Sequence, residues 1–269
     1  MRSRHSGFTL LEMSIVILVI AAITAGIVVG RDMIRSSQLR SAVEESQFYT
    51  QALKNFQDKY GELPGDFTKA TSIWGAQHAT PATCVTTVTN LEMTCNGDGD
   101  GWITNQATSA TYYEQFRAWQ QLNLAGFIPV SVTPITSAGG TQARTVGYNI
   151  PASKLDGAGW GLVAQSIYQV TVVNTTFITY YANDIPPNHV LILGGSSISG
   201  YLSSSYQSQR ITPSEAKGID EKIDDGLPRL GRLVVQTNPA PTTACHSSDT
   251  AFNVSNNDPI CTLVFKTGL

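Results

Sequence analysis

The stretch with the clearest metal chemistry is CNGDGDGWI, residues 95–103, in which oxygen-bearing side chains alternate with glycines. Asn96, Asp98 and Asp100 stand at every second position, and the backbone carbonyl of Trp102 follows. In EF-hand-like loops, alternate side-chain oxygens converge on one calcium ion while a glycine permits the sharp turn. The stretch therefore predicts a Ca²⁺ site, and an Asp- and Gly-rich turn without an ion is the alternative.

The last part of the calcium pattern is incomplete. Position twelve of the loop is Ala107, where an EF-hand-like loop has a bidentate glutamate. Another carboxylate must complete the shell, and we expect it to be Glu114, at the start of the next helical segment. The predicted ligands are Asn96, Asp98, Asp100, the Trp102 carbonyl and Glu114.

A second acidic segment, ITPSEAKGIDEKIDDGLPRLG, covers residues 211–231. Thr212 and Glu215 have the spacing of a helix capping box, and the Asp-Asp-Gly-Leu-Pro run predicts the stop of that helix and a turn. Three aspartates could hold a second cation: Asp220, Asp224 and Asp225. Capping and turn chemistry also account for these aspartates without an ion.

Four cysteines form two close pairs in segments rich in Thr, Asn, Ser and Pro. In an oxidising compartment, proximity favours Cys84 with Cys95 and Cys245 with Cys261 among the three connectivities. Four reduced thiols or a metal site are the alternatives. No pair has the CxxC spacing of common zinc sites, although His246 adjoins Cys245.

The rest of the chain has no recognisable catalytic motif. The four histidines, His5, His78, His189 and His246, are scattered, and no glycine-rich phosphate loop precedes a helical segment. The formal net charge of -3, with both signs mixed along the chain, is not that of a nucleic-acid binder. We therefore expect neither an enzyme nor a nucleic-acid partner.

The N-terminal segment is apolar enough to cross a membrane. From Phe8 to Gly30 the only charged side chain is Glu12, and a helix of that length spans about 34 Å, against about 30 Å of bilayer hydrocarbon. A secretory signal peptide is the alternative, but its cleavage site follows the apolar run. Here the small and polar residues precede the run.

The order of these residues resembles the processing site of the type IV pilin and pseudopilin family. A short basic leader, residues 1–7, ends in Gly7 and is followed by Phe8-Thr9-Leu10-Leu11-Glu12. The resemblance implies that prepilin peptidase cuts after Gly7 and that Phe8 becomes the N-methylated first residue. A glycine lets the scissile backbone enter a protease cleft without a side-chain clash.

The resemblance also gives Glu12 a role in assembly. Its carboxylate and the new ammonium of Phe8 are opposite charges that attract strongly in a low-dielectric setting. Between neighbouring subunits the same attraction would set the axial register of a filament. The alternative is a tolerated membrane glutamate without a special role.

From this resemblance we expect a structural subunit of a type IV pilus-like filament. Its partners would be prepilin peptidase, other pilin subunits and the assembly platform. The precursor would lie in the bacterial inner membrane with its head in the periplasm, and the filament would be periplasmic or extracellular. Calcium in some pseudopilin heads agrees with the predicted loop.

The size of the head favours a minor or tip subunit, because residues 61–269 are more than a simple major subunit needs. The alternatives are a type II secretion pseudopilin, and a tip adhesin or DNA-uptake module.

Positioning these residues requires an α+β fold with a long helical spine. Residues 8–60 contain no proline and continue from the apolar run into an amphipathic pattern, which predicts one helix ending near Gly61. Two separate helices are the alternative. Residues 8–30 would form the transmembrane segment and filament core, and the upper half would pack on the head.

The head, residues 61–269, is predicted to be an antiparallel β-sheet packed against the spine, as in pilins. A helix is expected at 113–122 with Phe116, Trp119 and Leu122 in the core, and the segment after Cys245 is expected to be a loop closed by Cys261. Strands are expected at 161–164, 167–173, 177–181, 189–193 and 232–235.

Overall fold

The computed structural model describes residues 9–78, 84, 88–104, 114–135, 143–164, 189–196, 209–237 and 244–269. The leader with Gly7 and Phe8, and the strands expected at 167–173 and 177–181, lie outside these residues. The helices are α1 (Leu10–Tyr60), α2 (Ala70–Trp74), α3 (Glu114–Leu124) and α4 (Pro213–Ile223). The strands are β1 (Gly159–Ala164), β2 (His189–Gly194), β3 (Leu233–Thr237), β4 (His246–Ser248), β5 (Ala251–Phe252) and β6 (Cys261–Lys266).

The spine is one uninterrupted helix, so the prediction of a single helix is confirmed. α1 has 51 residues and a length of about 76 Å. It begins after the N-cap Thr9 and ends at Gly61, whose φ of 78° is the left-handed conformation that glycine tolerates best at a helix end.

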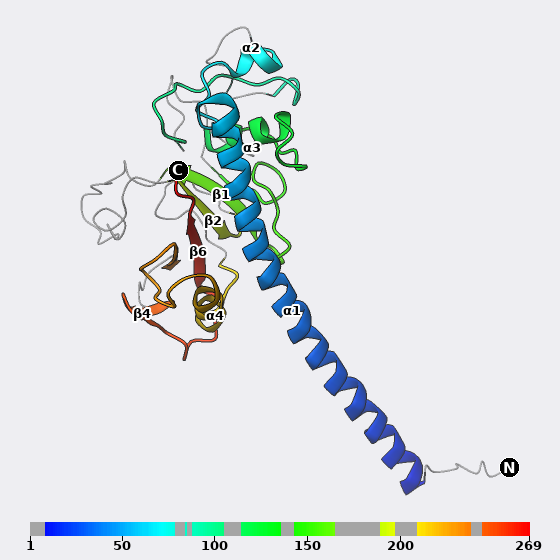
Figure 1. The fold of residues 1–269 in the computed structure, drawn as a ribbon. Helices are drawn as coiled ribbons and strands as arrows, with labels where there is room; N and C mark the ends of the chain where they lie inside the picture. The colour runs from blue at the N-terminus through cyan, green and yellow to red at the C-terminus, as the bar shows by residue number, and fades with distance from the viewer. Residues whose placement is uncertain are drawn as a thin grey trace, which may run out of the picture.

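The two halves of α1 have different surroundings (Figure 1). Residues 10–29 project away from the head with every side chain exposed. In the upper half the buried side chains lie three or four residues apart, at Ala42, Tyr49, Leu53 and Phe56 among others, and these pack on the head. Burial of this stripe is the main force that fixes the head to the spine.

The main sheet has four antiparallel strands in the order β1-β2-β6-β3. The strands expected near 161–164, 189–193 and 232–235 are therefore present as β1, β2 and β3. The segment expected as a loop closed by Cys245 and Cys261 is closed by that disulfide, but it contains the small β4-β5 hairpin. The strand that follows it, β6, was not expected and lies in the interior of the sheet. Leu263 of β6 pairs with Leu193 of β2 and Val235 of β3.

One face of the sheet belongs to the main core with α1 and α3. Trp160 of β1 stacks edge-on against Tyr49 of α1 and also contacts Phe265 of β6. Its indole N–H donates to the Oε2 atom of Glu45, also on α1, at 2.8 Å. The opposite face contributes a smaller buried cluster, made of Val190, Ile192, Val234 and Val264.

α3 lies within the core, and the expected apolar stripe of Tyr113, Phe116, Trp119 and Leu122 is confirmed for its last three residues. Phe116, Trp119 and Leu122 are completely buried, whereas the expected first residue of this helix, 113, lies outside the described residues. Several polar side chains of α3 are buried as well, among them Arg117. Such polar groups must find partners inside the protein.

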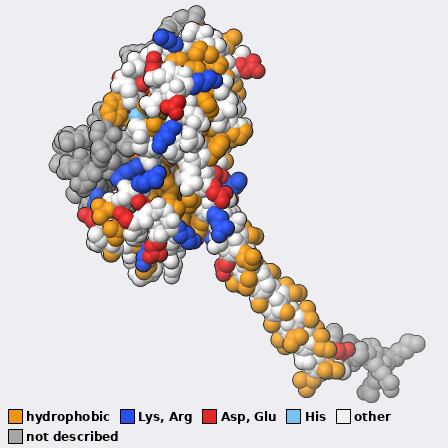
Figure 2. Space-filling model, in the orientation of Figure 1, with side chains coloured by type: hydrophobic (Ala, Val, Ile, Leu, Met, Phe, Trp, Pro, Cys, Tyr) orange, Lys and Arg blue, Asp and Glu red, His pale blue; other side chains and the backbone are white. Residues whose placement is uncertain are grey.

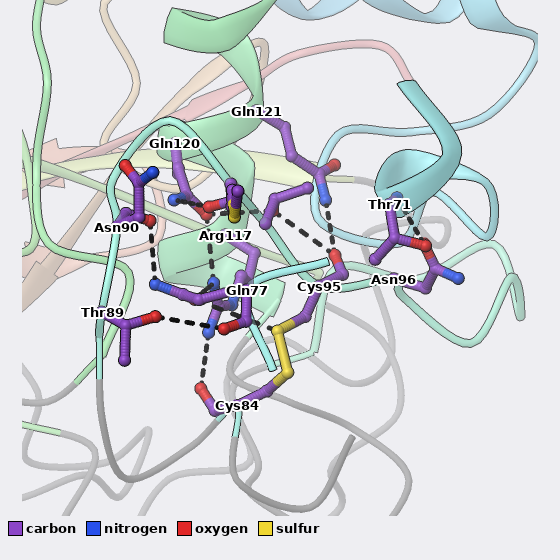
Figure 3. The surroundings of a disulfide bond; sticks show 12 residues. Thr71, Gln77, Cys84, Thr89, Asn90, Cys95, Asn96, Arg117, Gln120 and Gln121 are labelled. Carbon is purple, nitrogen blue, oxygen red and sulfur yellow. Dashed lines mark hydrogen bonds between the residues drawn. A yellow bond between two sulfur atoms is a disulfide. The ribbon is translucent and has the colours of Figure 1, made fainter. Parts of the chain in front are cut away.

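Both expected disulfides are present, Cys84–Cys95 and Cys245–Cys261. Arg117 connects the first of them to α3 (Figure 3). Its guanidinium donates to the carbonyl of Cys84 at 2.5 Å and to the amide oxygen of Gln77 at 2.6 Å. Burial lowers the pKa of Arg117 to about 9, because these acceptors are neutral.

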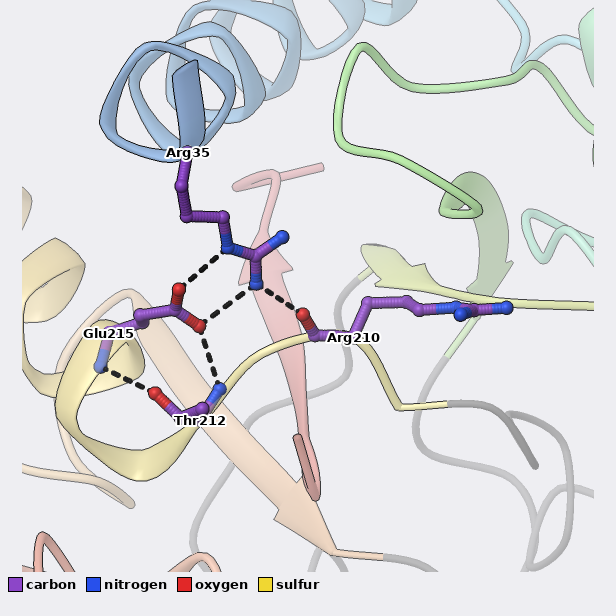
Figure 4. A network of polar contacts seen from close by, with 4 residues as sticks. All are labelled: Arg35, Arg210, Thr212 and Glu215. Atoms are coloured by element: carbon purple, nitrogen blue, oxygen red, sulfur yellow. Dashed lines mark hydrogen bonds and ion pairs between the residues drawn. The ribbon is translucent and has the colours of Figure 1, made fainter. Parts of the chain in front are cut away.

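An ion pair joins α4 to the spine just above the exposed segment (Figure 4). The Nε atom of Arg35 donates to the Oε1 atom of Glu215 at 2.6 Å, and Nη2 donates to Oε2 at 2.9 Å. Nη2 also donates to the carbonyl of Arg210. Both ionic side chains are partly exposed, so we expect this pair to contribute on the order of 1 kcal/mol.

Candidate functional site

The expected assembly residue, Glu12, lies at the very start of the spine. Its Oε2 atom accepts hydrogen bonds from the amide of Thr9 at 2.8 Å and from the hydroxyl of Thr9 at 2.9 Å, while its own amide donates to that hydroxyl. This is a capping box. It holds the carboxylate beside Thr9, the residue that follows Phe8 in the sequence.

The processing residues Gly7 and Phe8 lie outside the described residues. Cleavage and methylation there therefore stay predictions from the sequence motif. The Thr9 cap was not expected, although the T-x-x-E spacing of a capping box is visible in the chain.

Residues 10–29 of α1, here called the lower spine, have an almost continuously hydrophobic surface (Figure 2). By length and composition, α1 can cross a membrane, and none of its most apolar stretch is buried inside the described protein. Exposing an apolar surface of this extent to water is unfavourable, and such surfaces mark membrane or protein contacts. The lower spine is therefore an interaction surface.

In the acidic loop the structure brings Asp98 and Asp100 together with Asp66, which the sequence analysis did not identify. One carboxylate oxygen from each lies within 4.8 Å of the others. The loop folds around the carboxylate of Asp66, which accepts hydrogen bonds from the amides of Gly99 at 2.6 Å, Asp100 at 3.1 Å and Gly101 at 2.9 Å.

Glycine is needed in this loop for close approach as well as for turning. A Cβ atom at Gly97 would overlap the backbone of Asp66. Gly101 adopts a φ of 87°, as the sharp turn of the predicted loop requires. The glycines therefore allow the loop to lie directly on the segment that carries Asp66.

The other two predicted side-chain ligands have their own hydrogen bonds. The Oδ1 atom of Asn96 accepts from the amide of Thr71, on α2, at 2.8 Å. The Oε2 atom of Glu114 accepts from the amide and hydroxyl of Thr104, at 2.9 and 2.7 Å. Its Oε1 atom reaches the same acidic loop, where the amide of Asp98 lies at 3.4 Å.

The two buried carboxyl groups of this region, those of Asp66 and Glu114, have raised pKa values. Burial raises the pKa of Glu114 to about 8 despite its hydrogen bonds to Thr104. Burial also raises the pKa of Asp66 to about 7, and the charge of Asp100 adds to this rise, whereas the amides of Gly101 and Gly99 oppose it. A cation would compensate this concentration of acid groups.

The donor set fits a hard cation. Three carboxylates supply oxygen atoms only, which is the chemistry that Ca²⁺ prefers, and carboxylate oxygens within 4.8 Å of one another can share one ion at ordinary Ca–O distances. Asp66, Asp98 and Asp100 would hold the ion, and calcium would neutralise their charge. Occupation of this loop by calcium stays a prediction.

The predicted capping box of the second acidic segment is confirmed. The hydroxyl of Thr212 accepts a hydrogen bond from the amide of Glu215 at 3.3 Å. The amide of Thr212 donates to the Oε2 atom of Glu215 at 2.9 Å. The helix ends at Ile223 with Asp224 as its C-cap, where the stop signal was predicted. Asp220, Asp224 and Asp225 lie together at this end.

The described histidines lie in separate environments. His189 is buried, and its Nε2 atom accepts from the amide of Ile103 at 3.1 Å, so it holds the acidic loop against β2. Burial lowers the pKa of His189 below its usual value, and the backbone of Leu269 opposes this shift. His246 contacts the carbonyl of Ser248 in the small β4-β5 hairpin. These are structural contacts.

Comparison with known proteins identifies the N-terminus. A family described as the prokaryotic N-terminal methylation motif matches residues 2–28. No curated protein and no solved structure matches this chain. The matched residues contain the basic leader, Gly7, Phe8 and Glu12 in the order that the sequence analysis expected. The chain thus carries the N-terminal methylation motif that is the signature of type IV pilins and pseudopilins, processed subunits built on an apolar N-terminal helix.

Proposed function

We propose that this protein is a minor or tip subunit of a type IV pilus-like filament, with a structural role and no catalytic one. Prepilin peptidase cleaves it after Gly7, and Phe8 is methylated. The precursor lies in the bacterial inner membrane with its head in the periplasm. The assembly platform then transfers it into a periplasmic or extracellular filament of pilin subunits.

The observation that supports this role best is the division of α1. Every side chain of residues 10–29 is exposed, whereas the residues above are fixed by the apolar core and by the Arg35–Glu215 pair. One helix can thus exchange lipid for neighbouring helices without any change in the head. A filament subunit needs this property.

A minor or tip position is favoured over a major one by the size of the head, which begins at Gly61 and continues to residue 269. The pseudopilin alternative uses the same spine. On the face in Figure 2, Lys and Arg alternate with Asp and Glu, and no basic stripe forms on that face of the described head. This distribution does not favour a DNA-uptake tip over an adhesin or a structural subunit.

Mass spectrometry of the mature N-terminus tests the proposal. In cells with prepilin peptidase, the N-terminal peptide is expected to begin with methylated Phe8, and in cells without the peptidase residues 1–7 should remain. A Gly7→Val variant should retain the leader even when the peptidase is present. Cleavage near Gly30, or a leader retained in wild-type cells, would contradict the proposal.

We also propose that the acidic loop binds calcium, with Asp66 in addition to the ligands expected from the sequence. Asp66 is only 2% exposed, and the neighbouring Asp98 and Asp100 place further negative charge beside it. Calcium there would stabilise the loop against β2, to which His189 already connects it.

Terbium luminescence provides a specific test of this loop, because Trp102 is two residues after Asp100 in the sequence and its indole can sensitise a bound lanthanide. Terbium emission excited through tryptophan is expected, calcium should displace it, and Asp98→Asn/Asp100→Asn should remove at least about 90% of it. Affinity should fall below about pH 7, because Asp66 has a pKa of about 7 and is then protonated. Unchanged emission from the double variant would exclude this site.

A further inference from the structure

Asp220 is a buried carboxylate to which no described residue donates a hydrogen bond. It lies on α4, its side chain is completely buried, and neither of its oxygens accepts a hydrogen bond from the described part of the chain. An unsatisfied buried charged group costs several kcal/mol, so such groups normally have a partner or bind an ion. Helix capping explains neither oxygen of Asp220.

The groups nearest to Asp220 add negative charge. Asp224 and Asp225 each place a carboxylate oxygen within 4.8 Å of one on Asp220. Burial and the charges of these two aspartates raise the pKa of Asp220 to about 7, whereas the backbone of Gly226 opposes this rise. The Gly226 amide is nevertheless too far or too poorly aligned to count as a hydrogen-bond donor to Asp220. All three lie at the C-terminal end of α4, where the helix dipole is itself negative.

The neighbouring loop is folded around the same carboxylates. The Oδ2 atom of Asp224 accepts hydrogen bonds from the amides of Arg232 and Leu233, at the start of β3. Gly231, with a φ of 71°, lies so close to Asp224 that a Cβ atom there would overlap its carboxylate. The Oδ1 atom of Asp225 accepts from the amide of Leu227 at 2.8 Å.

These backbone contacts leave several oxygens for a ligand. Both oxygens of Asp220, Oδ1 of Asp224 and Oδ2 of Asp225 have no hydrogen-bond donor among the described residues. Ca²⁺ binds oxygen ligands at about 2.3–2.6 Å, so two ligands on opposite sides of one ion are separated by at most about 5 Å. One carboxylate oxygen from each of the three aspartates lies within 4.8 Å of the other two, so they meet this condition.

We infer that Asp220, Asp224 and Asp225 form a calcium-binding site at the C-terminal end of α4, separate from the acidic loop at Asp98 and from the proposed filament role. Water and backbone carbonyls complete the coordination shell. The ion supplies the partner that buried Asp220 lacks, and it offsets the negative end of the helix dipole.

Occupation of this site would connect both ends of α4 to other elements. The first turn of α4 carries Glu215, which is bound to Arg35 of the spine. In the last turn, the ion would bind Asp220 together with Asp224. Asp224 in turn accepts hydrogen bonds from the amides at the start of β3. Calcium would thereby stabilise the part of the head that is bound to the spine at Arg35.

Calorimetry on the full-length protein in detergent, after removal of metals with a chelator, tests the inference. We expect Asp220→Asn to bind one calcium ion fewer per chain than wild type. Asp225→Asn, at an exposed position, should lose the same ion or bind it at least about tenfold more weakly, and it provides the test if Asp220→Asn does not fold. Asp258→Asn, an exposed aspartate elsewhere in the head, is the matched control.

Thermal unfolding distinguishes calcium from a proton held on Asp220. Calcium should raise the unfolding temperature of wild type and of Asp258→Asn more than that of Asp220→Asn, and Asp98→Asn/Asp100→Asn should keep this difference. Equal calcium stoichiometry and an equal rise in wild type, Asp220→Asn and Asp225→Asn would overturn the inference. So would a wild-type protein that binds no calcium at millimolar concentration.

Discussion

Replacing Glu12 with alanine is expected to reduce incorporation into filaments at least about tenfold, while leaving cleavage after Gly7 intact. The variant removes the only charge of the exposed apolar helix segment. With it would go the proposed partner of the ammonium that cleavage after Gly7 would create at Phe8. An unpaired charge at membrane depth costs roughly 2.5–3.5 kcal/mol on insertion scales. The measurement is the amount of the protein in sheared filament fractions relative to the membrane fraction.

Two further variants separate the charge of Glu12 from its capping role. Glu12→Gln keeps an oxygen that can accept from Thr9 but has no charge, whereas Thr9→Ala keeps the charge and removes the capping hydroxyl. We expect Glu12→Gln to assemble as poorly as Glu12→Ala, and Thr9→Ala to assemble nearly as well as wild type. Normal assembly of Glu12→Gln would show that helix capping, and not charge, is what the residue provides.

Removal of the Cys245–Cys261 disulfide is expected to be the most destabilising of the conservative changes in the head. The bridge closes a segment with a sequence separation of 16, for which chain entropy predicts about 3 kcal/mol. For a head of this size the unfolding temperature should fall by about 6–12 °C. Thermal unfolding of Cys245→Ala/Cys261→Ala under non-reducing conditions measures the effect.

The other disulfide is a matched comparison because its sequence separation is 11, and chain entropy alone predicts nearly the same effect. Cys261, however, begins strand β6, and its amide donates to the carbonyl of Ile211 at 2.9 Å. We therefore expect Cys84→Ala/Cys95→Ala to lose less stability. A larger loss from that variant would mean that the contacts of buried Arg117 depend on the first bridge.

Features encoded by neighbouring residues were predictable from the sequence. The spine was expected at 8–60 and is described as Leu10–Tyr60, because its apolar pattern and the glycine that ends it are local signals. The capping box at Thr212 and the pairing of nearby cysteines are local in the same way.

Features that depend on distant partners were not predictable. β6 has a short apolar run within a segment rich in Asn, Pro and Thr, and it is a strand because β2 and β3 flank it. Asp66 lies more than thirty residues before the loop whose amides it binds, so spacing rules for calcium loops could not include it. Among the described residues, the lack of a hydrogen-bond donor to Asp220 likewise depends on how α4 packs.

The position of β6 also has a consequence for biosynthesis. β1 and β2 precede residue 195, yet β2 and β3 are joined only through β6, which begins at Cys261. During translation the ribosome must therefore deliver residues 261–266 before this sheet can close, and loop closure over such separations slows folding. Until then the nascent head presents unpaired strand edges. A chaperone that shields these edges would be needed most after β1 and β2 have been synthesised and before β6 has been.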